Sequence, residues 1–80
     1  MSNQEWVEQY RACIARRSAA LVSPDRQAAF LAALTQALEE AIYGGEEGCV
    51  KAAADILMEF TNRAQEAQEI PALCVQQLAG

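Results

Sequence analysis

The chain has 80 residues and a formal net charge of −5, with eleven Asp or Glu against six Lys or Arg and no histidine. This length allows one small domain, and the acidic balance argues against nucleic acid or an anionic membrane surface as the main ligand. Hydrophobic residues make up 52% of the chain, but 17 of them are alanines, which favour helix while each buries little area.

The first predicted helix covers residues 3–22. Ser2 and Glu5 have the spacing of a capping box, in which the serine oxygen accepts a hydrogen bond from the amide three residues later. A stripe of residues then recurs every three or four positions, which is typical of a helix with one buried face. The stripe consists of Trp6, Tyr10, Cys13, Ile14, Arg17 and Leu21.

The second predicted helix covers residues 24–43. Ser23 precedes Pro24, and proline is favoured at the first helical position because it has no amide hydrogen to leave unpaired. Leucines follow at spacings of three and four, and Gly44 and Gly45 end the helix because glycine adopts the left-handed C-terminal conformation freely.

The third predicted helix covers residues 47–69, with Glu46 and Glu47 at its positive N-terminal end. Proline lacks an amide hydrogen and collides with the preceding helical turn, so Ile70-Pro71 is expected to break or kink the helix. The apolar residues that follow, from Leu73 to Leu78, predict a short fourth helix.

No segment alternates apolar and polar residues as a strand would. We therefore predict an all-α protein, a small antiparallel three-helix bundle with a short C-terminal fourth helix, and a single helical domain over residues 1–80. A core of this size stabilises a monomer only weakly, so a homodimer is expected.

The chain has an odd number of cysteines, which are widely spaced and form no CxxC pair: Cys13, Cys49 and Cys74. This pattern favours free thiols in a reducing compartment. The N-terminal residues lack the basic start and the apolar run that are typical of a signal peptide. No apolar stretch approaches the roughly 18 residues of a membrane span. The sequence therefore predicts a cytoplasmic protein with no membrane contact.

Catalysis is not expected, and no catalytic, cofactor-binding or metal-binding residues are assigned. Without histidine, the candidate acids and bases are mainly the adjacent pairs Glu39-Glu40 and Glu46-Glu47, whose members point about 100° apart on a helix. The glycine-rich loop 44–48 lacks the lysine of a phosphate-binding loop. The three cysteines are too far apart in sequence to suggest a zinc site.

Protein binding is the predicted function, and two groups of residues are candidates for it. Trp6, Tyr10, Ile14 and Arg17 share one stripe, and Trp, Tyr and Arg often dominate the energetics of interfaces. The alternative is that Trp6 and Tyr10 close the bundle core. The second group is acidic and would face a basic partner. It consists of Glu39, Glu40, Glu46 and Glu47.

The leading hypothesis is a small regulator or inhibitor, of bacterial or phage type, that docks a helical face onto a larger protein and blocks or modulates it. The alternative is a small secretion- or assembly-type chaperone that holds an amphipathic client segment in a groove. A third hypothesis is a thiol-based sensor that uses Cys49, which lies near a helix N-terminus. Direct nucleic-acid binding through the basic cluster is not expected, because most of the chain is acidic. The cluster consists of Arg11, Arg16, Arg17 and Arg26.

Overall fold

The computed structural model describes residues 2–79, and within that range it contains helices and turns but no strand. The predicted all-α class is confirmed. Two single-turn 3₁₀ helices, η1 (Pro24–Arg26) and η2 (Ile42–Gly44), lie between the longer ones. The α-helices are α1 (Asn3–Ser18), α2 (Gln27–Ala41), α3 (Gly45–Thr61) and α4 (Ala64–Ala79).

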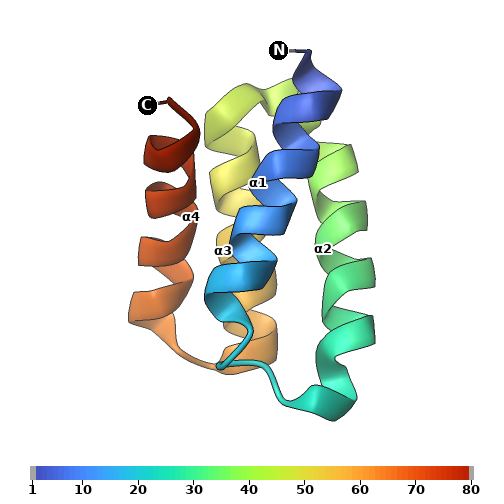
Figure 1. The fold of residues 1–80 in the computed structure, drawn as a ribbon, viewed down its shortest axis with the longest axis vertical. Helices are drawn as coiled ribbons and strands as arrows, with labels where there is room; N and C mark the ends of the chain where they lie inside the picture. Colours follow the sequence, from blue (N-terminus) through green and yellow to red (C-terminus); the bar gives the residue numbers. More distant parts are fainter. Residues whose placement is uncertain (1, 80) are drawn as a thin grey trace.

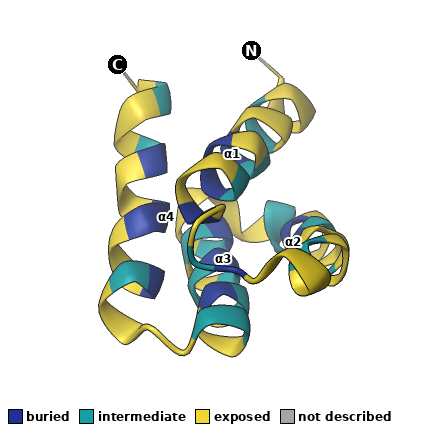
Figure 2. Ribbon diagram, turned by 60° about the horizontal axis from the view of Figure 1, so that its bottom comes forward, coloured by how far each residue is buried: buried dark blue, intermediate teal, exposed yellow. Residues whose placement is uncertain are grey.

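The helices follow one another up and down the long axis of the molecule (Figure 1). α1 runs away from the end that carries the N-terminus, α2 returns to it, α3 runs away again and α4 returns. Both chain ends therefore lie at the same end of the molecule. Figure 2 shows that the buried residues of each helix lie on the side that faces the other helices.

The start of α1 confirms the predicted cap, since the amide of Glu5 donates to the side-chain oxygen of Ser2 at 3.2 Å. The helix ends at Ser18, earlier than the predicted residue 22. Ser18 is fully buried, and its hydroxyl donates back to the carbonyl of Ile14 at 2.7 Å. The amides of Leu21 and Val22 both bond to the Ser18 carbonyl, so the chain leaves the helix through a tight turn.

The boundary between the last two helices differs from the prediction. The third helix was expected to reach residue 69, but α3 ends at Thr61 and Asn62 adopts the left-handed conformation (φ 56°, ψ 31°). The side-chain oxygen of Thr61 accepts from the amide of Arg63 at 3.2 Å, which steadies this turn. Asparagine tolerates the left-handed conformation better than most residues, and so it ends the helix here.

The predicted break at Ile70-Pro71 does not occur, because α4 has 16 residues and passes through Pro71. Proline costs the helix one backbone hydrogen bond. Pro71 is buried, and the hydroxyl of Tyr10 points at its carbonyl oxygen in a long hydrogen bond of 3.5 Å. α4 therefore continues through Pro71, with the proline buried beside α1.

The core draws on all four α-helices. Phe30 of α2 meets Phe60 of α3 edge to face, with ring centroids 5.5 Å apart, and Tyr10 of α1 is fully buried. These side chains enclose smaller ones, so that the interior fills without large gaps. The buried hydrophobic residues are Tyr10, Cys13, Ile14, Val22, Phe30, Leu34, Leu38, Cys49, Ala53, Leu57, Ala67, Ile70 and Cys74.

A disulfide joins Cys13 of α1 to Cys74 of α4, with their Cα atoms 5.9 Å apart. The prediction of free thiols is therefore wrong for these two residues and holds for Cys49, which is free and buried. Paired cysteines are typical of oxidising compartments. The inference of a reducing cytosol from three free thiols consequently loses its basis.

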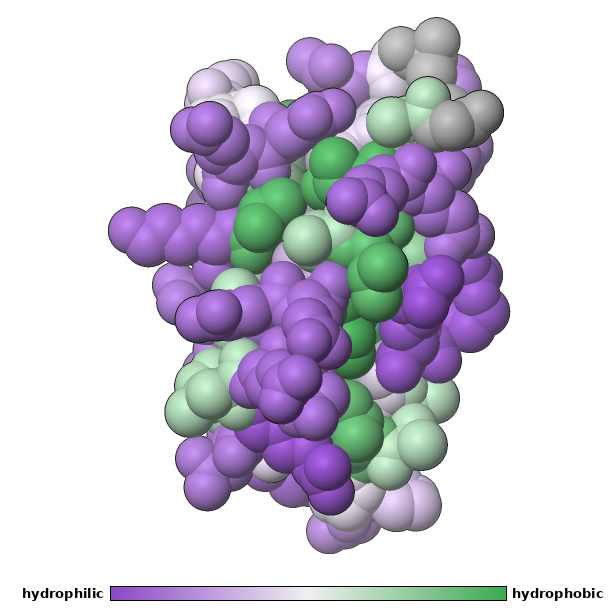
Figure 3. Space-filling model, turned by 90° about the vertical axis from the view of Figure 1, so that its left-hand side faces the viewer, coloured by the Kyte–Doolittle hydropathy of each residue, from purple (hydrophilic) through white to green (hydrophobic). Residues whose placement is uncertain are grey.

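The face on which α4 lies carries a band of hydrophobic side chains that runs along the molecule between hydrophilic regions (Figure 3). Leu73 of α4 is 43% exposed. Within residues 2–79, none of the helices combines the length and the apolarity that crossing a membrane requires.

Loss of the disulfide should destabilise the fold. The two cysteines are 61 residues apart, and a cross-link over such a loop stabilises by about 4 kcal/mol, mainly through the entropy of the unfolded chain. We expect the double variant Cys13→Ser/Cys74→Ser to lose about that much free energy of unfolding in urea titrations. Reduced wild type should match the variant, and equal stability of the oxidised and reduced wild type would contradict the pairing.

Asn62 should tolerate glycine but not alanine. Alanine in a left-handed position costs about 1 kcal/mol because its Cβ approaches the carbonyl oxygen, whereas glycine carries no such cost. Thermal melts of Asn62→Ala should show the loss, and Asn62→Gly should equal or exceed wild type. An unchanged melting temperature for Asn62→Ala would place the helix boundary elsewhere.

Candidate functional site

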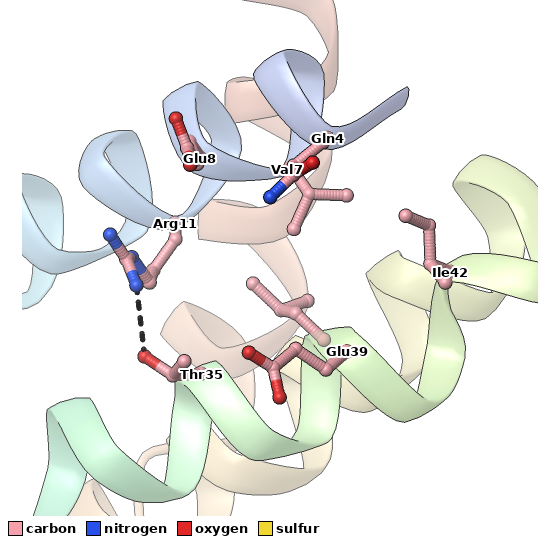
Figure 4. A pocket seen from close by; sticks show the side chains of 8 residues that line it. Gln4, Val7, Glu8, Arg11, Thr35, Glu39 and Ile42 are labelled. Atoms are coloured by element: carbon pink, nitrogen blue, oxygen red, sulfur yellow. Dashed lines mark hydrogen bonds between the residues drawn. The ribbon is translucent and has the colours of Figure 1, made fainter. Parts of the chain in front are cut away.

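A cleft opens between α1 and α2. It encloses about 260 Å³, and Figure 4 shows side chains from both helices around it. Its position follows from the way α1 packs. Arg17 of α1 donates to the side-chain oxygen of Gln77 in α4 at 3.1 Å, and the disulfide joins the same two helices. The lining residues are Gln4, Val7, Glu8, Arg11, Thr35, Leu38, Glu39 and Ile42.

The base of the cleft is apolar. Val7 comes from α1, Leu38 from α2 and Ile42 from η2, and Leu38 is fully buried while Val7 and Ile42 are half-buried. Val7 and Ile42 therefore leave part of their apolar surface open to the cleft. An apolar surface that remains open to water favours occupation by an apolar group.

A hydrogen bond between the two helices closes one end of the cleft. The Arg11 guanidinium donates through Nη1 to Oγ1 of Thr35 at 3.2 Å, and that hydroxyl donates to the carbonyl of Leu31 at 2.8 Å. Arg11 is thereby held across the gap. Leu31 lies one turn before Thr35 on the same side of α2 and is 39% exposed, so apolar surface continues beyond this bond.

The rim of the cleft is acidic. Glu8 and Glu39 are both exposed and line the cleft. In Figure 4 the carboxylate of Glu39 lies between the two helices, whereas that of Glu8 lies on the outer side of α1. The cationic lining residue, Arg11, already donates to Thr35. No hydrogen bond to Glu39 is drawn in that view. Its carboxylate is therefore the nearest charged group that a ligand entering the cleft meets.

A second cavity of about 240 Å³ adjoins the first, because Val7 and Ile42 line both. It lies where the start of α1 meets η2 and the first turns of α3. We call the two adjoining cavities together the α1 groove. The residues that line the second cavity are Ser2, Asn3, Trp6, Val7, Ile42, Gly45, Glu46 and Cys49.

The predicted aromatic patch lies mainly in the core. Tyr10 and Ile14 are fully buried, so their assignment to a docking surface is corrected, and the alternative that Tyr10 closes the core describes its position. Trp6 is half-buried, stacks on Tyr10 with ring centroids 4.8 Å apart, and lines the second cavity. Arg17 is exposed and bonded to Gln77 on the α4 side.

The four predicted acidic residues are all exposed. Glu39 lines the first cavity and Glu46 lines the second, so the structure brings these two to the same groove. Glu40 and Glu47 each follow one of them in sequence and do not line either cavity.

Several residues of the α1 groove were not identified from the sequence. Val7 lies between the stripe positions of the first helix, and Thr35 separates two leucines of the second. A signal did exist, because residues at spacings of three and four lie along one side of a helix. The residues with this spacing are Leu31, Thr35, Leu38 and Ile42. Such spacing identifies a shared side of the helix, but not whether a neighbouring helix covers it.

Two titratable side chains lie under the groove, and burial keeps both of them protonated. Burial raises the pKa of the Tyr10 hydroxyl well above its ordinary value, helped by the nearby Cys49. Burial also raises the pKa of the Cys49 thiol. Since the thiolate is the reactive form of cysteine, Cys49 is a poor nucleophile in the folded protein.

Metal binding finds no support in the part of the chain that the structure describes. Residues 2–79 contain no group of three or more Cys, Asp, Glu or His side chains placed to hold a metal ion. Every buried side-chain nitrogen and oxygen in that range has a hydrogen-bond partner. The residues that line the α1 groove make it apolar at its base and charged at its edge.

Scans against protein-family models, curated proteins and solved structures each returned no match.

Stability should fall in alkaline solution. The ordinary pKa is 10.0 for Tyr10 and 9.0 for Cys49, and both are raised in the folded state. The unfolded chain therefore releases these protons first, so the stabilisation is complete below about pH 9 and is lost as the pH rises. Urea midpoints should begin to drop above about pH 9 and should continue to fall above about pH 10.

The matched variants are Tyr10→Phe, which should flatten this dependence, and Tyr43→Phe, which should not. Tyr43 is 95% exposed, so its substitution serves as the matched surface control. Equal slopes for the two variants would contradict the burial of the Tyr10 hydroxyl.

Proposed function

We propose that this protein is a small non-enzymatic regulator or inhibitor that binds another protein through the α1 groove and thereby blocks or modulates it. The observation that carries the proposal is the apolar surface that Val7 and Ile42 leave partly exposed in the groove, beside the buried Leu38. A partner that covers this part of the groove removes apolar surface from water, which is the main driving force of protein association.

The size of the cavities supports a protein partner over a small molecule. At about 260 and 240 Å³, each is smaller than the roughly 300–1,000 Å³ of pockets that enclose small ligands. Each is suited to a single bulky side chain. Two adjoining cavities therefore fit two anchoring side chains from one protein segment.

The chemistry of the groove supports binding without catalysis. Arg11 is engaged with Thr35, and the Cys49 thiol is held protonated by burial, which raises its pKa. Catalysis requires a nucleophile or base beside a group that orients it, and the groove offers carboxylates at its edge without such a partner. The same burial gives no support to a thiol sensor based on Cys49.

A chaperone remains the second candidate, because a groove between two helices can hold an amphipathic segment of a client. The two functions differ in what the client does alone. A regulated partner folds without this protein, whereas a client would stay soluble only when both are co-expressed.

Self-association is also proposed, through the apolar band on the α4 side rather than through the α1 groove. The exposure of Leu73 supports it. A homodimer formed there leaves the groove open to another protein.

The α1 groove can be tested by affinity capture from cells of the native host. Val7→Arg places a charge in the middle of the groove, and Met58→Arg places the same charge on α3, where Met58 is 42% exposed. We expect Val7→Arg to reduce recovery of the bound protein at least about tenfold, as loss of an apolar anchor at an interface core does. Met58→Arg should retain it.

Circular dichroism and thermal melts of both variants provide the control for folding. Equal recovery by wild type and Val7→Arg, measured by quantitative mass spectrometry, would contradict a role for the groove.

A further inference from the structure

We propose that the occupant of the α1 groove is a basic amphipathic helix, which places two apolar side chains in the two cavities and its lysines or arginines opposite Glu39 and Glu46. This inference rests on the proposed function and specifies the chemistry of the partner.

The shape of the groove favours a helix. Val7 and Ile42 line both cavities, so one segment that fills both needs two side chains that are close neighbours. On a helix, residues three or four positions apart lie on one face with about 5–6 Å between their Cβ atoms. An extended strand would instead need a free sheet edge to pair with, and residues 2–79 contain no strand.

Charge selects the partner among amphipathic helices. Glu8 and Glu39 line the first cavity and Glu46 lines the second, while Arg11 is the cation of the groove and is already bonded to Thr35. Glu40 and Glu47 are exposed beside them. The chain as a whole carries a net charge of −5. An acidic helix would be repelled from this surface, whereas a basic one is attracted and oriented by it.

The carboxylate of Glu39 lies between α1 and α2, where a cation on a bound segment can reach it. In Figure 4 the dashed bond of the first cavity joins Arg11 to Thr35, and the carboxylate of Glu39 has none drawn to it. A lysine or arginine on the rim of a bound helix can reach this carboxylate without desolvating it fully, which avoids the cost of a buried ion pair. Charge pairs of this kind mainly set specificity and the rate of association.

The experiment is a selection from a displayed library of amphipathic helices of about 15 residues, a length that can fold on binding. Two leucines four positions apart are fixed and the flanking positions are random. Sequences are first selected on the wild-type protein, and those that also bind Val7→Arg are then removed. What remains depends on the groove.

We expect Lys and Arg to outnumber Asp and Glu at least about threefold among the groove-dependent sequences, since the rim selects by charge. A synthetic peptide of such a sequence should bind Glu39→Lys about tenfold more weakly than wild type. The matched control is Glu59→Lys, which makes the same change at an exposed position of α3 outside both cavities and should leave affinity within about twofold. Replacing the opposing peptide lysine by glutamate should restore binding to Glu39→Lys.

Two other outcomes overturn the inference and can be told apart. Groove-dependent sequences that are neutral or acidic, or that bind Glu39→Lys as well as wild type, would exclude a basic partner and leave the proposed function standing. A selection that yields no groove-dependent sequence would contradict both proposals.

Discussion

The attachment of α1 to α4 determines what the rest of the molecule can do. Three contacts join the two helices along their length: the disulfide between Cys13 and Cys74, the bond from Arg17 to Gln77, and the Tyr10 hydroxyl directed at Pro71. Because α1 presents Tyr10 and Cys13 to this side, smaller and polar residues remain for the side that faces α2. The cleft between α1 and α2 is the consequence.

Packing and function are linked through the residues on either side of α1. Tyr10 lies in the core and directs its hydroxyl at the Pro71 carbonyl of α4, whereas Val7 and Arg11 line the groove. The bond from Arg11 to Thr35 holds α2 at a fixed place opposite α1 without filling the space between them. A binding surface that is already formed needs little ordering when a partner arrives, and this lowers the entropic cost of association.

Local signals in the sequence were sufficient for the helices but not for their neighbours. Ser2 with Glu5 marked the start of α1 correctly, because capping depends on residues only a few positions apart. The start predicted at Pro24 is wrong for α2, because Pro24 begins the 3₁₀ helix η1, the side chain of Ser23 makes no capping bond, and α2 begins at Gln27. The boundary at Asn62 was missed because Pro71 gave a stronger local signal, although Pro71 lies inside α4, buried beside α1. Tertiary context of this kind is not visible in a window of a few residues.

The candidate site was predicted in part for the same reason. Periodicity placed Trp6, Tyr10 and Ile14 on one face of the first helix, but could not show that α4 covers most of that face. The pairing of Cys13 with Cys74 over 61 residues has no local signal at all. Glu39 and Glu46 were identified by charge, and the structure adds the apolar cavities that they border.

Hydrogen–deuterium exchange of the protein, alone and bound to the partner it captures, tests most directly whether the α1 groove is the binding surface. We expect slower exchange on binding in residues 4–11 of α1 and 35–42 of α2 and η2, with α4 unchanged. Protection confined to α3 and α4, with α1 and α2 exchanging as in the free protein, would contradict a function based on the groove.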